Sequence, residues 1–324
     1  MYKDEGPDPP TSSTMTPASE AKGKRVEINQ FYLTDIPNTM QRKGWLQGAR
    51  FMRRWFAAPA FELPLEYKTG SKSASTLAPA HVLEDLPIRW LQSASSRVWP
   101  TVEEIVKEFQ HVDYHNNRLG KVYGIVDNLS KGLIILMKRI DRMGLIDHQS
   151  SKLRTRVISL PTSSALQLDD TSQFNLEKFG EYGLFDALDD VFAALGAFSL
   201  KMAATDFNTY VDDRGYSIIQ INEIGLYVRD TYDFLNEDGE DQKLGFWNKN
   251  DVKKGAAAIF SDVVIELPEF YWKVTNNDFN EYRRLFSLGG DFIAFSTVER
   301  FSVDITIRLN AEDFEEYSVR KNKI

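Results

Sequence analysis

Ionisable side chains gather where an alternating apolar run, Ile219 to Val228, comes to an end. The polar residues that follow it directly are Arg229, Asp230, Tyr232 and Asp233. Alternation is typical of a strand with one buried face, and sites are often built where a strand passes into a loop. Carboxylate oxygens are ligands that Mg²⁺ accepts, and a bound cation would polarise a phosphate or a carbonyl group. The stretch therefore predicts a site in which Asp230 and Asp233 are metal ligands.

Whether these side chains meet depends on the backbone. In an extended segment Asp230 and Tyr232 point to one side and Asp233 to the other, whereas a turn that begins at Asp233 would bring all three together. A guanidinium would then hold an anionic oxygen of the substrate, and the candidates for it are Arg229, Arg283 and Arg284. The alternative is a strand end at which an aspartate caps the next turn and Tyr232 packs on Trp247.

A second polar stretch, residues 276–292, could close over this site. Asn277 or Asp278 can cap a short helix, and Gly289 and Gly290 permit positive φ before the next strand. In the functional interpretation the helix covers the two carboxylates and Asp291 forms part of the wall. The structural alternative is a capped helix followed by a tight turn into a strand.

The elements that must position these residues follow from the periodicity of the C-terminal half. Period-two patterns predict strands near Val157 and at 198–204, 216–228, 262–274, 291–296 and 300–309. A turn at 212–215 would join two of them as a hairpin. A buried helix is expected at 185–195. Residues 151–324 are therefore predicted to form a mainly antiparallel sheet with one packed helix.

Residues 26–150 are predicted to form an α-rich lobe. A helix should begin near Ile36 and end before Pro59, because four apolar residues recur on one face: Trp45, Ala49, Met52 and Phe56. Its remaining surface is basic, so it could alternatively lie on an anionic membrane surface. Further helices are expected at 86–91, at 101–111 and at 122–143. With a polar, disordered tail at 1–25, the parts give an α+β protein.

The amino-acid composition limits the classes to which the protein can belong. The chain has 324 residues, and its 42% hydrophobic content is enough for a large core. A formal charge of −8 without a long basic stripe argues against a nucleic-acid partner. The absence of cysteine excludes disulfides and thiolate chemistry. The sequence also shows no signal peptide and no apolar run suited to a transmembrane helix.

Segments spread over residues 30–300 share features with one family. They are Ile36 to Trp45, Arg54 to Phe61, Leu188 to Gly196, Tyr227 to Phe234, Leu244 to Trp247, Asn277 to Phe279 and Gly289 to Phe292. Together they resemble a family of uncharacterised bacterial proteins often encoded near type VI secretion genes. The resemblance implies an exported antibacterial effector or a helper encoded beside one. Its partners would be the secretion machinery or a cognate immunity or effector protein.

A narrower similarity concerns the motif Asp230-x-Tyr232-Asp233. It resembles the acidic motif of colicin M-type toxins, phosphodiesterases that cut the undecaprenyl-linked peptidoglycan precursor. Those enzymes continue with a His-Arg pair, whereas this chain has Asp238-Gly239-Glu240-Asp241 at that place. The likeness implies a metal-assisted phosphodiesterase, and the departure leaves its general acid or phosphate clamp unassigned.

The leading hypothesis is a type VI secretion-associated antibacterial effector, made in the cytoplasm and delivered to a target cell. It would hydrolyse an envelope phosphodiester with Mg²⁺ at Asp230, Tyr232 and Asp233, assisted by Arg229 and Arg283. One alternative is a non-catalytic adaptor or immunity protein, and another is a toxin that acts on membranes through the basic helix. A convergent, open pair of carboxylates would favour the enzyme, whereas carboxylates held in local caps would favour the adaptor.

Overall fold

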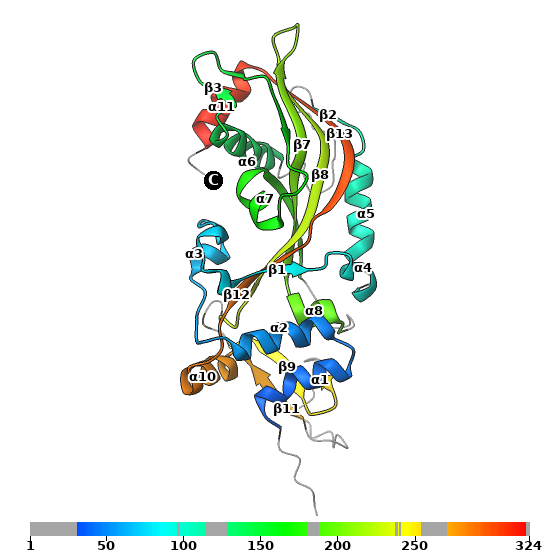
Figure 1. Ribbon diagram of the computed structural model, residues 1–324, viewed down its shortest axis with the longest axis vertical. Coiled ribbons are helices and arrows are strands. Elements are labelled where there is room, and N and C mark those ends of the chain that lie inside the picture. The colour runs from blue at the N-terminus through cyan, green and yellow to red at the C-terminus, as the bar shows by residue number, and fades with distance from the viewer. Residues whose placement is uncertain are drawn as a thin grey trace, which may run out of the picture. The chain divides into compact units, whose positions relative to one another are not determined.

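A long antiparallel hairpin forms the middle of the main sheet in the computed structural model (Figure 1). Its strands are β7 (Phe198–Val211) and β8 (Ser217–Tyr232), joined by the turn that the sequence predicted. The structure describes residues 31–95, 98–114, 129–180, 188–236, 239, 241–253 and 271–321. The tail expected at residues 1–25 lies outside these ranges, and Phe31–Ile324 forms one compact unit.

Strands from both halves of the chain extend the sheet beyond β8. The antiparallel neighbours of β8 on one side are β12 (Phe292–Ser296) and β13 (Glu299–Leu309), both close to their predicted bounds. β1 (Val82–Leu86) pairs in parallel with β12, and β2 (Val112–Tyr114) pairs in parallel with β13. The predicted α+β class is confirmed. The sheet nevertheless takes two strands from the part of the chain expected to be purely helical.

Shorter strands complete the other side. β5 (Arg156–Ser159) and β6 (Gln173–Phe179) pair antiparallel with β7, and the strand expected near Val157 is β5. β3 (Ile146–Asp147) and β4 (Lys152–Leu153) form a separate two-stranded ladder. Most of the strand expected at 262–274 lies outside the described residues.

The apolar pattern of β8 contains a slip that marks a β-bulge. Ile219 and Ile221 alternate, but the next apolar position is Ile224, three residues further on. The pairing of β8 with both β7 and β13 changes register at this point. Beyond the bulge every residue from 224 to 230 is buried, so both faces of this part of β8 are covered. Ionisable side chains that enter here are therefore removed from water.

Helices cover both faces of the sheet (Figure 1). On one face lie α6 (Leu129–Arg142), α7 (Ala165–Thr171) and α11 (Ala311–Arg320), and on the other lies α5 (Val98–Phe109). The prediction of one packed helix in the C-terminal half is thus wrong. The missed helix α7 has only seven residues, which is too short for a clear helical period.

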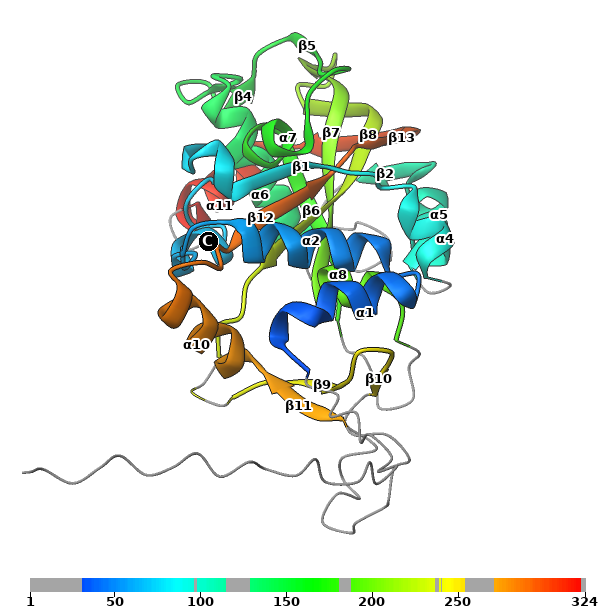
Figure 2. The ribbon, with the colours of Figure 1, turned by 60° about the horizontal axis from the view of Figure 1, so that its bottom comes forward.

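Several small elements gather at the end of β8 where Tyr232 lies (Figure 2). α1 (Ile36–Arg42) and α2 (Leu46–Ala57) pack beside α8 (Asp190–Leu195). The approach of α2 to α8 requires Gly48, because a Cβ there would lie 2.7 Å from the Ala193 Cβ. The carboxylate of Asp190 accepts hydrogen bonds from the backbone N–H groups of Gln47 and Gly48, which joins the two helices.

A second sheet lies next to them. It has the order β10 (Val252–Lys253), β9 (Lys243–Trp247) and β11 (Trp272–Thr275), all antiparallel. α10 (Asn276–Phe286) follows β11 directly, and its capping box joins Thr275 and Asp278. The capped helix predicted at this place is confirmed, with Thr275 rather than Asn277 or Asp278 as the N-cap.

The N-terminal helices differ from their predicted bounds. Gly44, with φ of +78°, divides the expected single helix into α1 and α2, and a short 3-10 helix (Leu33–Asp35) precedes them. α5 begins at Val98, so the expected start at Thr101 is wrong. The structure describes only Leu129–Arg142 of the helix predicted at 122–143. α8 begins at Asp190, later than the predicted helix at 185–195, because Asp189 is its N-cap; residues 185–187 lie outside the described ranges.

The connection at 60–100 contains more structure than expected. It holds α3 (Leu65–Lys68), 3-10 turns at Ala74–Thr76 and Pro79–His81, and α4 (Trp90–Ala94). β1 occupies Val82–Leu86, where the sequence predicted no strand, and the helix in this region, α4, begins at Trp90 rather than at Leu86. Its Glu84 and Asp85 are exposed, which disguises a strand that pairs with the sheet along one side only.

The apolar face of α2 is buried. Trp45, Ala49, Met52 and Phe56 belong to the main core, as predicted. The basic side chains on the remaining surface also have protein partners, for example Arg54 with two backbone carbonyls and Arg50 with Asp85 at 3.1 Å. The face that a membrane would contact is therefore used by the fold. Among the described residues no helix is long and apolar enough to cross a membrane.

Candidate functional site

Three of the predicted site residues, Arg229, Asp230 and Tyr232, lie in β8, and Asp233 follows its last residue. Tyr232 pairs with Phe292 and Asp230 pairs with Ala294 on β12, so the strand continues past Val228, where the sequence predicted its end. Alternation along this strand directs Asp230 and Tyr232 to one face and Arg229 to the other. The sheet therefore separates Arg229 from the carboxylate that it was expected to assist.

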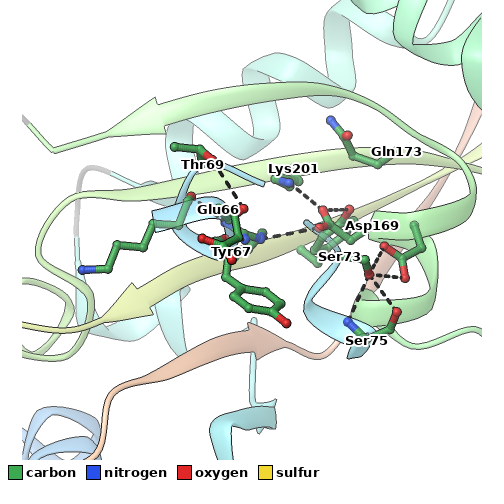
Figure 3. Close-up of polar contacts among 12 residues, drawn as sticks. Glu66, Tyr67, Thr69, Ser73, Ser75, Asp169, Gln173 and Lys201 are labelled. Atoms are coloured by element: carbon green, nitrogen blue, oxygen red, sulfur yellow. Dashed lines mark hydrogen bonds and ion pairs between the residues drawn. The ribbon is translucent and has the colours of Figure 1, made fainter. Parts of the chain in front are cut away.

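Arg229 belongs to a buried ionic cluster that we call the Asp169 cluster. It consists of Asp169, Lys201, Tyr227 and Arg229 (Figure 3 labels Asp169 and Lys201). The Asp169 carboxylate lies 2.6 Å from Lys201 Nζ, 3.0 Å from the Tyr227 hydroxyl and 3.5 Å from Arg229 Nε. Lys201 and Tyr227 are register partners on β7 and β8, so one aspartate of α7 ties the helix to the hairpin.

Burial governs the protonation of this cluster. It lowers the pKa of Lys201, although Asp169 acts in the opposite direction. It raises the pKa of Tyr227 well above its usual range, and the charge of Asp169 adds to this effect. The phenol therefore stays a hydrogen-bond donor at neutral pH, and Asp169 is its acceptor.

The segment that contains α3 lies over this cluster and is fixed to it by polar contacts. Arg229 donates hydrogen bonds to the carbonyl oxygens of Tyr67 and Lys68, at the C-terminal end of α3. Lys68 Nζ in turn lies 2.7 Å from Asp233 Oδ1. Further along, the Ser73 hydroxyl donates to Asp170, and Figure 3 shows Ser73 beside Asp169. Two of the predicted site residues, Arg229 and Asp233, thus hold a covering segment in place.

Asp233 also forms a local turn. Its Oδ1 accepts a hydrogen bond of 3.0 Å from the backbone N–H of Leu235. The carboxylate is nearly buried, with 13% of the side chain exposed, and Lys68 supplies its counterion. This arrangement matches the structural alternative that the sequence left open, in which an aspartate caps the next turn.

On the opposite face, Asp230 and Tyr232 line a cavity of about 750 Å³. The wall combines residues of α1, α2, α8, α10 and the second sheet with the end of β8. Its large side chains include Met52, Trp45, Phe234, Trp247 and Phe279. The wall of the cavity thus combines aromatic and aliphatic side chains with several polar groups.

Both polar side chains from β8 are strongly perturbed by burial. It raises the pKa of Asp230 well above its usual range, and the charge of Asp233 raises it further. The pKa of Tyr232 is also raised, first by burial and then by Asp230. The Tyr232 ring stacks on Phe292 at 5.1 Å, not on Trp247, and its hydroxyl lies 3.5 Å from Met52 Sδ. Burial and the charge of Asp233 therefore both favour the protonated form of Asp230.

Arg283 lies in a different environment. Its guanidinium donates to the carbonyl of Gly289 at 2.9 Å and to Asp291, and it stacks 5.4 Å from the centre of the Trp55 ring. Asp291, expected in the site wall, is enclosed by these groups and also accepts a hydrogen bond from the Trp55 indole N–H at 2.9 Å. Burial raises the pKa of Asp291 to about 6.

Neither Arg283 nor Arg284 reaches the predicted carboxylates. Arg284 pairs with Glu281 on the surface of α10. The described contacts of Arg283 with acidic groups are those to Asp291 and, at 3.8 Å, to Glu62. The helix α10 therefore does not close over Asp230 and Asp233 with a guanidinium.

The two predicted metal ligands do not fit Mg²⁺ in this arrangement. Burial favours the protonated form of Asp230, and a protonated carboxyl is a poor ligand for a hard cation. The carboxylate of Asp233 is already held by Lys68 and Leu235. In the parts of the chain that the structure describes, no group of three or more metal-ligating side chains is found. A magnesium site stays a prediction, and the positions of these side chains do not support it.

Sequence reasoning missed the cluster beneath α3. Lys201 and Tyr227 stood in apolar strand segments, and a charged residue within such a segment is itself a signal of a buried partner. The partner, Asp169, comes from a short helix that the sequence did not reveal. Lys68 lies in a connection where no periodicity indicated contact with β8.

Comparisons with known proteins give a family and no characterised relative. No curated protein and no solved structure matches the chain. A family model described as a family of unknown function, DUF6402, matches residues 31–311, which include the whole hairpin, the Asp169 cluster and the cavity. The chain belongs to the DUF6402 family.

Proposed function

We propose that this protein is a non-catalytic binding protein of a bacterial secretion system, an adaptor or immunity protein for an antibacterial effector. The secretion context comes from the resemblance of its segments to proteins encoded near type VI secretion genes. The choice of a binding protein over an enzyme comes from the positions of the predicted site residues.

One observation carries the proposal, which is the separation of Arg229 from the acidic motif together with the pairing of Asp233 with Lys68. Arg229 lies on the face of β8 opposite Asp230 and Tyr232, and the carboxylate of Asp233, which also lines the cavity, is held by Lys68. A hydrolytic site needs its nucleophile, acid or metal ligands within hydrogen-bond reach of one reacting group. Here the side chains expected to cooperate are engaged separately in packing and local caps.

The proposal is tested by expression of the full chain in a bacterial host, once in the cytoplasm and once exported to the periplasm. We expect normal growth in both compartments, because a binding protein without its effector has no reaction to perform. Growth arrest in either compartment would overturn the binding proposal.

A second step tests the partner. The effector encoded beside the gene for this chain is expressed in the compartment where it is toxic, with and without this protein. Relief of toxicity would identify an immunity role, and unchanged toxicity with stable co-purification would identify an adaptor. If toxicity is not relieved and the two proteins do not co-purify, both the immunity role and the adaptor role are contradicted.

One specific observation favours the effector as a second candidate. Asp230 lies in the wall of a cavity, and a carboxyl whose pKa is raised by burial can serve as a general acid. Such a group could protonate the leaving oxygen of an envelope phosphodiester, the lipid-linked peptidoglycan precursor being the candidate. In that case Asp230→Asn and Tyr232→Phe should remove toxicity, whereas Asp213→Asn, an exposed residue of the β7–β8 turn, should keep it.

A further inference from the structure

We propose that the cavity at the end of β8 receives a cationic side chain, a lysine or an arginine, carried on an apolar segment of the partner protein. This inference deepens the proposed binding function and depends on it. The cavity of about 750 Å³ falls in the size range of sites that bury a small ligand or a few side chains.

The wall of the cavity suits an apolar chain with a positive end. Trp45 and Trp247 meet edge to face at 6.5 Å on one part of the wall, and Tyr232, Phe234 and Phe279 form another. Aromatic rings offer apolar contact area and a negative face that attracts ammonium and guanidinium groups. Aliphatic side chains of α1 and α2 complete the apolar surface.

The buried carboxyl in the cavity wall, Asp230, lacks a positively charged partner. Asp230 is 6% exposed and has no ion pair among the described residues. Two neighbouring cations are used elsewhere, because Arg229 is held by the Asp169 cluster and Lys68 by Asp233, and Lys243 lies at the exposed rim. A buried carboxyl without a counterion is costly to ionise, which is reflected in the raised pKa of Asp230. A cationic side chain of a partner protein would supply the counterion that the fold does not provide.

Other ligand classes fit less well. An anionic group would meet Asp230, Asp233 and Asp241 in the wall, against one lysine, Lys243, at the exposed rim. A neutral apolar group would leave the carboxyl without a charged partner. The formal charge of −8 on the chain also draws basic partners toward it. The occupant that satisfies all the wall groups is both apolar and cationic.

The test uses calorimetry on the purified full chain with three probes that share one six-carbon chain: hexylamine, hexanol and hexanoate. We expect hexylamine to bind roughly tenfold more tightly than hexanol, since a charge-assisted hydrogen bond contributes about that factor. Hexanoate should bind most weakly. Equal affinities for the amine and the alcohol, or binding of none of the probes, would overturn the proposal.

Two variants identify the group responsible. Asp230→Asn keeps the shape of the neutral carboxyl and should abolish the preference for the amine while retaining the affinity for hexanol. Asp213→Asn makes the same chemical change at an exposed turn residue and should leave all three affinities unchanged. An amine preference that survives in Asp230→Asn would refute the role of this carboxyl.

A peptide pair then tests the source of the cation. One short apolar peptide carries a central lysine, and its counterpart carries norleucine, which has the same chain without the ammonium group. We expect the lysine peptide to bind and the norleucine peptide to bind at least roughly tenfold more weakly. If hexylamine binds but the lysine peptide does not, the cavity is a small-amine site and the protein occupant is refuted. Because these measurements use purified protein, their failure is distinguishable from a failure of the growth assays.

Discussion

Replacing Asp230 with asparagine tests whether its carboxyl is neutral in the folded protein. Burial, and then the charge of Asp233, raise the pKa of Asp230 well above its ordinary value of 3.8. Asparagine has nearly the shape of the neutral acid and cannot ionise. We therefore expect Asp230→Asn to be more stable than the parent protein at neutral pH.

The direction and size of this gain in the free energy of unfolding follow from the linkage between proton binding and folding. A pKa that is higher in the folded state than in the unfolded chain means that folding takes up a proton. The stabilisation is fully present below the unfolded pKa and is lost as the pH rises toward the folded pKa. Within that window the free energy of unfolding of the parent should fall, relative to the variant, by up to about 1.4 kcal/mol for each pH unit.

The assay is urea unfolding of both proteins at about pH 5, 6 and 7, followed by circular dichroism, with the free energies extrapolated to water. Other groups that titrate in this range, such as Asp291 with its pKa raised to about 6, are common to both proteins and cancel in the difference. The difference should increase with pH. A difference that is independent of pH, or a variant less stable than the parent at every pH, would refute a neutral Asp230.

Asp233→Asn serves as the matched comparison, three residues further along the same strand end. It removes a carboxylate that is paired with Lys68 at 2.7 Å and leaves the ammonium group nearly buried without a counterion. The expected loss is about 2–4 kcal/mol at neutral pH. The two substitutions should therefore change stability in opposite directions, which a simple catalytic pair of aspartates would not predict.

Three further changes test the packing. Leu226→Ala should lower the free energy of unfolding by about 2–5 kcal/mol in urea, because Leu226 is 1% exposed on β8; a loss below about 0.5 kcal/mol would show a surface position. Asp169→Asn should lower it by about 3–5 kcal/mol, since it leaves buried cations without their partner; an unchanged urea midpoint would contradict the role of the cluster. Gly289→Ala should lower the melting temperature far more than Gly44→Ala, although both glycines have positive φ, because a Cβ at Gly289 would lie 2.5 Å from the Trp55 ring and one at Gly44 meets nothing within 4 Å. Similar losses for the two alanine variants would mean that backbone strain alone matters.

Much of the sheet could be predicted from the sequence because its signal is local. The hairpin of β7 and β8 combines alternating apolar residues with a polar turn that contains Gly215, and both features can be seen in one short window. The core faces of β8 and α2 follow from periodicity for the same reason. The bulge could also have been detected, since the spacing from Ile221 to Ile224 breaks the alternation.

The candidate site could be located but not assembled. The sequence shows that charges collect at Arg229 to Asp233, yet it does not show that both faces of β8 are covered there. The covers are α3 on one side and the cavity wall on the other. α3 and the parts of the wall from α1 and α2 come from segments more than a hundred residues away in the chain. Contacts such as Arg229 to Tyr67, between residues 162 apart, leave no periodic pattern in either segment. The protonation of Asp230 depends on that burial and was therefore also hidden.

The parallel pairing of β1 with β12 has a consequence for how the chain folds as it is synthesised. Val82 pairs with Ile293, and Val112 of β2 pairs with Ile305, so β1 and β2 cannot pair until strands much later in the chain have been synthesised. Contacts between distant parts of a chain form slowly because a long loop must close first. Until residues 292–309 have emerged, β1 and β2 have unsatisfied hydrogen-bonding edges that other chains could join. The nascent protein is thus most exposed to aggregation, and most dependent on chaperones, in the interval between synthesis of β1 and synthesis of β13.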